Sequence, residues 1–506
     1  MRLGIDFGTT HTVIALVDRG NYPIASFEWG DAFPSVIAIR ARDGEVRYGH
    51  DAEEVASDPE FTMFRSFKRL VQDAGPLSEL VVGATTFRIA ELFAGYLARL
   101  KKALLEESNA GLEGETLEAA VSVPAHATSD QRFLTLDAFR RAGFEVLALL
   151  NEPSAAGFEY GHRFRRTLTS RREHVLVYDL GGGTFDASLV HMSGLANEVV
   201  ASAGIARLGG DDFDAAILAL ALAKAGVGPI DEAIRPALLE QVRHPKEALV
   251  PQSRKLVVDL SPIGHEPITL SLEDVNEVCA PLVDRTLAVI DSVLSAPRGT
   301  SEEGLSAKDV AGLYVVGGAS SLPLVGKRLR EIYGQPRVKR SPHPHAATAI
   351  GLACFLDEGA GFTLTDCLTR HFGVFRETDG GREVSFDPIF AKDTKLPSPR
   401  EPEIVTTRRY RPMHDIGRFR FVECTELRDG RPDGLVSPWD DVVFAFDPAL
   451  RDHPDLATLP AQRFEREGPE IEERFECDAS GLFRVTLTCL EDGYARSYRI
   501  ARHSHL

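Results

Sequence analysis

The stretch GIDFGTTHTVIALV, residues 4–17, places an acid, a glycine and two threonines between two apolar runs. Apolar residues alternate up to Phe7 and resume after the turn, so the pattern predicts a strand, a tight turn and a second strand. Gly8 lets the backbone approach a ligand closely, and Thr9 and Thr10 offer amide and hydroxyl donors to phosphate oxygens. Taken alone, however, such a sequence is more often just a turn.

The same design returns at residues 174–190, HVLVYDLGGGTFDASLV. Asp179 takes the place that Asp6 has in the first stretch, and Thr184 and Asp186 follow the turn. The turn itself consists of Gly181, Gly182 and Gly183. Three consecutive glycines cost backbone entropy, and a ligand close to the backbone would explain that cost. Two such hairpins predict a duplicated domain that holds a polyphosphate and its metal ion from opposite sides.

A third glycine turn follows the apolar run of LYVVGGASSLP, where Gly317 and Gly318 precede a serine-rich segment. We interpret this turn as the place of a nucleoside. Residues 120–161 and 343–356 carry small residues at helical spacing, which allows two helices to pack closely. We expect ordinary helix packing from these alanines.

Six motifs then identify a resemblance: DFGTT, VSVPA, NEPSAA, DLGGGTFD, RLGGDDFD and VVGGAS. They occur in the order found in the actin-like ATPase superfamily, and specifically in the seventy-kilodalton heat-shock (DnaK-type) chaperones. The resemblance implies an actin-like α/β ATPase domain with duplicated ribonuclease H-like halves over residues 1–356. It implies a linker over residues 357–365, and a smaller β-sandwich domain, similar to a substrate-binding domain, over residues 366–506. ATP or ADP with Mg²⁺ would be the ligands.

The resemblance also implies roles for individual side chains. Asp6 and Asp179 would bind Mg²⁺ through water, as suits carboxylates and a hard cation. Lys68 in FKRLV would lie near the γ-phosphate and the attacking water, and Glu152 in NEPSAA would help to fix the metal and its water shell. Taken singly, Lys68 is typical of a solvated surface lysine, and Glu152 before Pro153 is typical of a helix start.

Thr184 would contact the γ-phosphate, and Asp186 would assist proton transfer. Asp211 and Asp212 are interpreted as caps of the helix that follows LGG. The implied catalytic set is Lys68, Glu152, Asp179, Thr184 and Asp186. The remaining implied nucleotide contacts are Gly8, Thr9, Thr10, Gly181, Gly182, Gly183, Gly209, Gly210, Lys246, Gly317 and Gly318.

The nucleoside end departs from the family pattern. Ser321 stands where the family has an arginine that stacks on adenine, and His343 stands where it has a partnering aspartate. In VRHPKEALV, Lys246 is kept, but Arg243 and Val250 occupy positions of a ribose- or base-binding glutamate and serine. Because a serine cannot supply the stacking plane of an arginine, the base preference stays open, although Ser321 and His343 remain candidate nucleoside contacts.

Residues 366–500 predict an all-β domain, with short apolar-alternating runs between Gly, Pro and Asp turns. The clearest hairpin is FECDASGLFRVTLTCLEDG. A β-sandwich of this kind can bind an extended peptide through edge-strand hydrogen bonds and side-chain pockets. Three arginines near one strand are interpreted as a charged outer face, with acidic clients as the alternative: Arg408, Arg409 and Arg411.

The linker carries a short apolar patch, Phe362 and Leu364, which is weaker than the patch expected in the family and leaves the strength of interdomain coupling open. No amphipathic helical run follows the β domain before the last residues, ARHSHL. We therefore expect a short member without a helical lid, with fast peptide exchange.

Charge and composition restrict the remaining classes. A formal net charge of -18 argues against a nucleic-acid partner, and no run suggests a membrane span or a signal segment. Six cysteines are scattered without metal-ligand spacing, which suits a reducing cytoplasm.

The sequence thus favours an ATP-dependent chaperone that handles unfolded or extended peptide segments, or one dedicated client protein. A J-domain protein and a nucleotide-exchange factor are candidate helpers. The alternative is a nucleotide-sensing regulatory or scaffold protein with weak or no turnover. A sugar kinase or a filament former of the same superfamily is disfavoured by the β-sandwich and by NEPSAA.

Overall fold

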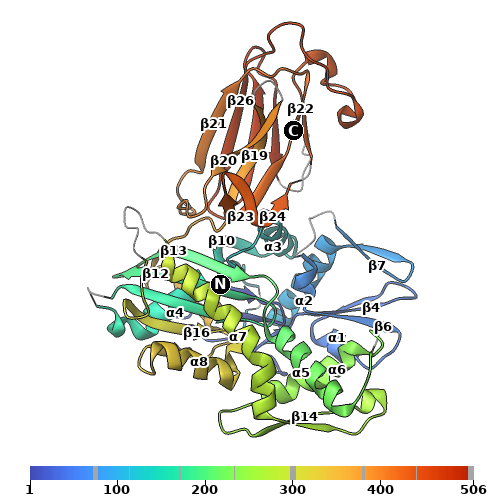
Figure 1. Cartoon of the computed structure of the whole chain (residues 1–506), viewed down its shortest axis with the longest axis vertical. Helices are drawn as coiled ribbons and strands as arrows, with labels where there is room; N and C mark the ends of the chain where they lie inside the picture. Colours follow the sequence, from blue (N-terminus) through green and yellow to red (C-terminus); the bar gives the residue numbers. More distant parts are fainter. Residues whose placement is uncertain are drawn as a thin grey trace.

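The structure is a computed structural model that describes residues 1–71, 78–112, 114–169, 172–232, 234–296, 304–378, 382–439 and 441–499. An α/β part extends to the end of helix α9, and a β part follows it at one end of the molecule (Figure 1). The predicted fold class, an α/β domain with duplicated halves followed by a smaller all-β domain, is confirmed.

The first half of the α/β part is built on a sheet of order β10-β9-β1-β2-β3. Its strands are β1 (Arg2–Phe7), β2 (His11–Leu16), β3 (Phe33–Pro34), β9 (Glu118–Val123) and β10 (Glu145–Asn151). β1 and β2 pair antiparallel across the first threonine turn, and β9 joins β1 in parallel. The predicted strand-turn-strand is therefore present, with nearly every β1 and β2 side chain buried.

The second half repeats this arrangement in a sheet of order β17-β16-β11-β12-β13-β18. Its strands are β11 (His174–Leu180), β12 (Phe185–Ser193), β13 (Ala196–Ile205), β16 (Val310–Val316), β17 (Val338–Arg340) and β18 (Thr363–Thr365). β11 and β12 pair antiparallel across the glycine turn, and β16 joins β11 in parallel. The internal duplication is confirmed. β18, which belongs to the expected linker, pairs in parallel with β13 at the sheet edge.

Helices α4 (Glu152–Phe164) and α9 (Ala347–Leu356) join the two halves by packing against each other. α4 also contacts β11 and β12, whereas α9 contacts β1 and β2. The backbones approach so closely that a Cβ on Gly351 would overlap the carbonyl oxygen of Ala155. The small residues of these segments thus serve helix packing, as the sequence predicted.

Further helices and small sheets cover the halves, and α5, α6 and β14 lie at the end remote from the β part (Figure 1). The helices are α1 (His50–Glu54), α2 (Ile89–Glu106), α3 (Ser129–Arg141), α5 (Gly210–Ala225), α6 (Arg235–Glu247), α7 (Leu272–Ser295) and α8 (Pro323–Tyr333), with a 3₁₀ turn η1 (Phe67–Val71). The small sheets are β4 (Val36–Arg40) with β5 (Val46–Tyr48) and β6 (Phe61–Arg65), β7 (Glu79–Val82) with β8 (Thr85–Arg88), and β14 (Lys255–Val258) with β15 (Ile268–Ser271). Among the described residues, no helix combines the length and apolar character needed to cross a membrane.

The β part contains two four-stranded antiparallel sheets and one strand pair. One sheet is β20 (Glu383–Phe390), β19 (His371–Thr378), β23 (Phe421–Arg428) and β24 (Arg431–Pro438). The other is β21 (Ile404–Tyr410), β26 (Ile471–Cys477), β27 (Phe483–Cys489) and β28 (Ala495–Arg499), and the pair is β22 (Ile416–Phe419) with β25 (Val442–Ala445). The predicted hairpin is β26–β27, with inward residues buried in strict alternation.

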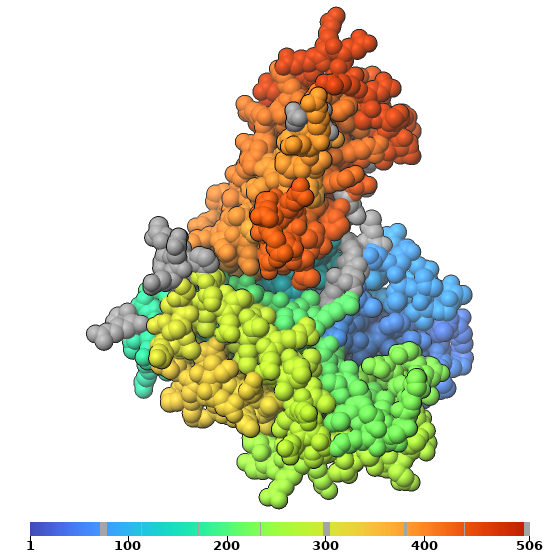
Figure 2. Space-filling model, in the orientation of Figure 1, coloured from blue at the N-terminus to red at the C-terminus, as the bar shows by residue number. Residues whose placement is uncertain are grey.

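The β part rests directly on the α/β part in the space-filling view (Figure 2), and buried polar contacts join the two. Asp366 accepts hydrogen bonds from Asn151 Nδ2 at 3.0 Å and from Ser154 Oγ at 3.2 Å. Glu423 of β23 accepts from the amide of Ser129 at 3.3 Å, at the N-terminus of α3. The junction thus places polar groups of the β part against the starts of α3 and α4.

Arg408, Arg409 and Arg411 all pair with carboxylates of the β part. Their partners are Asp387, Glu472 and Glu491, at 3.1, 2.7 and 3.2 Å. The three arginines therefore behave as a charged outer face, which is how the sequence was interpreted.

The α4–α9 crossing predicts that Gly351→Ala destabilises the protein. The added methyl group overpacks the crossing, so we expect the free energy of unfolding to fall by about 1–3 kcal/mol. Urea unfolding monitored by circular dichroism measures the change. Gly228→Ala is the control because a Cβ there meets nothing within 4 Å. Equal unfolding midpoints for both variants would contradict the close packing.

Candidate active site

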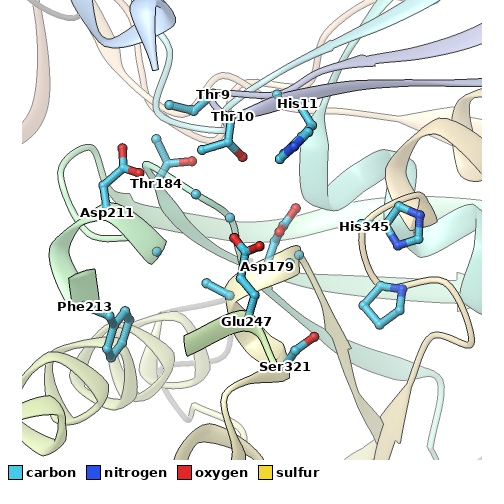
Figure 3. Close-up of a pocket in the computed structure, with 18 of the residues that line it drawn as sticks. Thr9, Thr10, His11, Asp179, Thr184, Asp211, Phe213, Glu247, Ser321 and His345 are labelled. Carbon is cyan, nitrogen blue, oxygen red and sulfur yellow. The ribbon is translucent and has the colours of Figure 1, made fainter. Parts of the chain in front are cut away.

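A cavity of about 360 Å³ lies between the two halves, where the two hairpin turns meet. Figure 3 shows Thr9, Thr10 and His11 on the wall formed by the β1–β2 hairpin, with Thr184 and Asp179 of the second half facing them. Both turns thus present hydroxyl groups to one space, as expected for a duplicated phosphate site.

Most residues predicted from the sequence line this cavity. They are Asp6, Gly8, Thr9, Thr10, Glu152, Asp179, Gly181, Gly182, Thr184, Gly210, Lys246, Gly317, Gly318 and Ser321. Five predicted residues lie outside the lining set: Lys68, Gly183, Asp186, Gly209 and His343. Lys68 pairs with the lining residue Glu152, and Asp186 is the β12 partner of Asp179. Two residues beyond His343, His345 faces the cavity (Figure 3).

The glycine turn packs tightly against the rest of the site. A Cβ on Gly182 would run into the side chain of Thr10, and a Cβ on Gly183 would meet Thr9 and Arg69. Gly209 lies against the backbone of Gly182 and Gly183 in the same way. The glycines therefore allow the two turns to approach each other. Close packing thus explains part of the backbone-entropy cost of three consecutive glycines, which the sequence analysis attributed to a ligand alone.

Lys68 is the cation of the site. Its side chain is only 11% exposed, and its ammonium group donates to the carbonyl oxygen of Phe7 and forms an ion pair with Glu152 at 3.3 Å. The same ammonium lies 5.1 Å from the ring centre of Phe7. Its placement on η1 between β1 and α4 differs from the solvated surface position that the sequence alone suggested.

Three carboxyl groups surround this cation, and each has a raised pKa. Burial is the main cause for all three, and the charges of neighbouring carboxylates add to it for Glu152 and Asp179. The pKa of Glu152 is raised to about 7, whereas Lys68 opposes the rise at Glu152, Asp6 and Asp179. At this end of the cavity one ammonium group faces three carboxyl groups, so the cluster is short of positive charge.

This imbalance suits a divalent cation. Carboxylates are the hard oxygen ligands that Mg²⁺ accepts, commonly with several of its waters retained. In the described part of the chain, no group of three or more His, Cys, Asp or Glu side chains is arranged to hold a metal directly. Asp6 and Asp179 both line the cavity, and their carboxylates are of the ligand type that a hydrated Mg²⁺ accepts.

Asp186 lies behind the wall and is only 1% exposed. Its Oδ1 accepts from the amide of Ala125 at 3.0 Å and is 3.0 Å from His126 Nδ1. Asp186, which was predicted to assist proton transfer, thus contacts two groups of the VPAHA segment.

The far end of the cavity is polar. Lys246 pairs with buried Asp214 at 2.8 Å and donates to the carbonyl of Gly210. Ser321 accepts a hydrogen bond from Arg340, and Glu247 at the end of α6 faces the same space (Figure 3).

Comparison with known proteins gives the family. The model of the Hsp70 protein family matches residues 2–417 of the 506-residue chain. The chain belongs to the Hsp70 family. This confirms the family that the six sequence motifs indicated.

Individual chaperones of the family are similar over most of the chain. It is 34% identical over 427 residues to the chaperone protein HscA of Cronobacter sakazakii, covering 80% of the chain and 65% of that protein. It is 32% identical to the HscA homolog of Azoarcus, with 66% of that protein covered. With an Escherichia coli HscA it is 33% identical over 521 residues, 98% of the chain and 77% of that protein. The chain spans about two thirds of the length of the first two relatives.

Sequence reasoning missed several residues of this site, and four of them bear on its chemistry. His11, Glu247 and His345 line the cavity, and His126 contacts Asp186. The signal for His345 was its place one residue beyond Pro344 in the segment already singled out. His11 directly follows the threonine turn, and burial, together with Arg243, lowers its pKa to about 4.

The raised pKa of Glu152 predicts a pH-dependent stability. Because the folded state binds this proton more tightly than the unfolded state, stability falls as pH rises from about 4.5 through about 7. The Glu152→Gln variant has no titrating carboxyl group at this position, so it does not lose this part of its stability as pH rises. Relative to the wild type, we expect the variant to gain about 1–3 kcal/mol in unfolding free energy between pH 5 and pH 8, without nucleotide or Mg²⁺.

Urea unfolding at the two pH values measures this gain. Glu106→Gln is the control, because Glu106 is 61% exposed on α2. If the stabilities of Glu152→Gln and the wild type changed in parallel with pH, the proton would not be held at Glu152.

Proposed function

We propose that the chain is an ATP-dependent chaperone of the Hsp70 type, which binds and slowly hydrolyses ATP to control how its β part holds a peptide or a client protein. The observation that carries the proposal is the Lys68–Glu152 ion pair, set among Asp6 and Asp179 beside two threonine turns. Such a cluster supplies the cation, the metal ligands and the phosphate donors that phosphoryl transfer requires.

In this mechanism the chain positions groups rather than forming covalent bonds. The hydroxyls of Thr9, Thr10 and Thr184 bind the terminal phosphates. Lys68 places positive charge beside the attacking water, and its ion pair with Glu152 opposes the protonation of that carboxylate. When bound through Asp6 and Asp179, Mg²⁺ would neutralise charge on the phosphate oxygens.

Two short connections would carry the nucleotide state to the β part. Asn151 holds Asp366, and the next residue along the chain is Glu152 in the carboxylate cluster. Thr369 donates to the carbonyl of Ala125, whose amide holds Asp186. A shift of the Glu152 carboxylate on hydrolysis would thus reach the β part through Asn151, and a shift of the Asp186 carboxylate would reach it through Ala125.

Edge strands support peptide binding by the β part. β20, β21 and β24 each lie at a sheet edge, and each exposes an apolar side chain. These are Val384, Val405, Leu435 and Val436, between 41 and 58% exposed. Edge backbone and apolar side chains together suit an extended peptide. We extend the proposal to a J-domain protein and a nucleotide-exchange factor as partners, and to a cytoplasmic site of action, which suits six free, buried cysteines.

A nucleotide sensor with little turnover is the second candidate. Contacts between the two halves favour it: Ser66 donates to Asp211 at 2.7 Å, and Arg65 pairs with Glu240 of α6 at 3.1 Å. Such contacts hold the two halves closed and would slow nucleotide exchange.

The proposed ATPase predicts that Lys68→Ala and Thr184→Ala lower single-turnover hydrolysis of ATP by about 100-fold or more, because each removes charge or a donor from the transferring phosphate. Hydrolysis with Mg²⁺ is followed by product separation, and GTP is assayed in parallel to report base choice. Lys102→Ala, with Lys102 60% exposed on α2, is the matched control. Retained hydrolysis in both variants would reject the site, whereas tight binding without turnover in the wild type would favour the sensor.

The proposed coupling predicts that Asp366→Asn and Thr369→Val weaken communication while hydrolysis stays within about threefold of the wild type. Trp439 donates to Glu423 at 3.1 Å in the junction, so its fluorescence reports docking in a Trp29→Phe background. We expect the two variants to lose most of the change in Trp439 fluorescence that ATP causes in the wild type.

Thr394→Val is the control for this experiment. Thr394 also donates to an alanine carbonyl, at 2.7 Å, but within the β part. A full ATP response in Asp366→Asn and Thr369→Val would show that these contacts do not carry the signal.

A further inference from the structure

A second, smaller cavity lies beside the candidate nucleotide site. Its volume is about 30 Å³, which is enough for a water molecule. Thr9 and Thr184 line both cavities, so the small one adjoins the end where the turns would hold the terminal phosphate. Lys68 and His126 are also part of its lining. The position suits the attacking water, and the polar side chains in an otherwise apolar lining can hold it.

His126 is held against a carboxylate. Its side chain is buried, with Nδ1 3.0 Å from Asp186 Oδ1. Because an ionised carboxylate only accepts hydrogen bonds, Nδ1 must carry the proton. In the neutral ring the lone pair is then on Nε2. Within the residues that the structure describes, the ring makes no other hydrogen bond.

The pair is fixed from a second strand. A Cβ on Gly204 of β13 would lie 2.6 Å from Asp186 Oδ1 and 2.8 Å from His126 Nδ1. Only a glycine leaves room for both groups there. The amide of Ala125 donates to the same oxygen at 3.0 Å, so the carboxylate cannot easily turn away from the ring.

The charged groups around the ring are few. Asp186 of β12 contacts it, and Lys68 of η1 shares the small cavity with it. α3 contributes neutral Gln131 and Thr135 to the cavity, and Glu152 is connected only through its ion pair with Lys68. The ring thus lies with the Asp186 carboxylate against Nδ1 and shares the small cavity with the ammonium of Lys68.

We propose that His126 is a catalytic residue that accepts the proton of the attacking water, with Asp186 acting through it. This rests on the proposed ATPase function. The water oxygen bonds to the γ-phosphorus as the bond from that phosphorus to the bridging oxygen breaks, and ADP leaves with the electron pair. The water proton goes to Nε2, Asp186 stabilises the imidazolium, and the proton passes to solvent when phosphate leaves. The arrangement follows the logic of an imidazole base oriented by a carboxylate.

The test is a pH–rate profile of single-turnover ATP hydrolysis for the wild type, His126→Asn and His191→Asn. Asparagine at position 126 keeps an N–H donor for Asp186 but removes the basic nitrogen. We expect the wild-type rate to rise through about pH 6–7 and His126→Asn to be about 10-fold slower or more, without that rise. His191→Asn is the matched control, since His191 also pairs with a carboxylate, Glu173 at 3.1 Å.

A second readout does not depend on turnover. Nitrogen-15 NMR of the wild-type ring at neutral pH should show protonated Nδ1 and unprotonated Nε2. The opposite tautomer, or a His126→Asn profile equal to that of the wild type, overturns the role of His126 and leaves the ATPase proposal standing. Absence of turnover in the wild type overturns both proposals. A rise that persists in His126→Asn at the wild-type rate would assign the titrating group to Glu152.

Discussion

The ion pair of Lys68 with Glu152 is the interaction on which the site depends. Buried carboxyl groups lose their hydration, so three of them around one cavity would protonate without a cation close by. A single lysine offsets part of this cost and leaves the rest for a ligand that brings positive charge. The duplicated hairpins and the crossing helices α4 and α9 hold the carboxylates close together around the cavity. The fold thus maintains an excess of buried negative charge there.

The sequence was sufficient to predict those parts of the fold and the site that consist of a short continuous motif. The two hairpins, the glycine turns and the α4–α9 packing all follow from local patterns, because a turn and the strands beside it are specified together. Lys68 was identified only through the resemblance, since its neighbours in the chain look like a surface segment. The histidine of the loop was placed two residues early, at His343 instead of His345, because the prolines of that loop leave no periodic pattern to fix the register.

Tertiary contacts were beyond local patterns altogether. His126 follows a strand as an ordinary loop residue, and its partner Asp186 lies 60 positions later on another sheet. The contacts of Asp366 with Asn151 and of Glu423 with Ser129 span more than 200 residues. Nothing in either segment indicates such a partner, because the residue type alone does not show whether a carboxylate is buried or which distant residue it contacts.

The placement of β18 has a consequence for dissecting the molecule. Thr363–Thr365 adds a parallel strand to the outer edge of β13, although it lies beyond the last helix of the α/β part. A fragment that ended at Leu356 would leave the backbone N–H and C=O groups of that edge unpaired, and exposed edges recruit strands from other molecules. The segment between the two parts thus also shields the α/β part against self-association, and a soluble fragment needs to extend to residue 365.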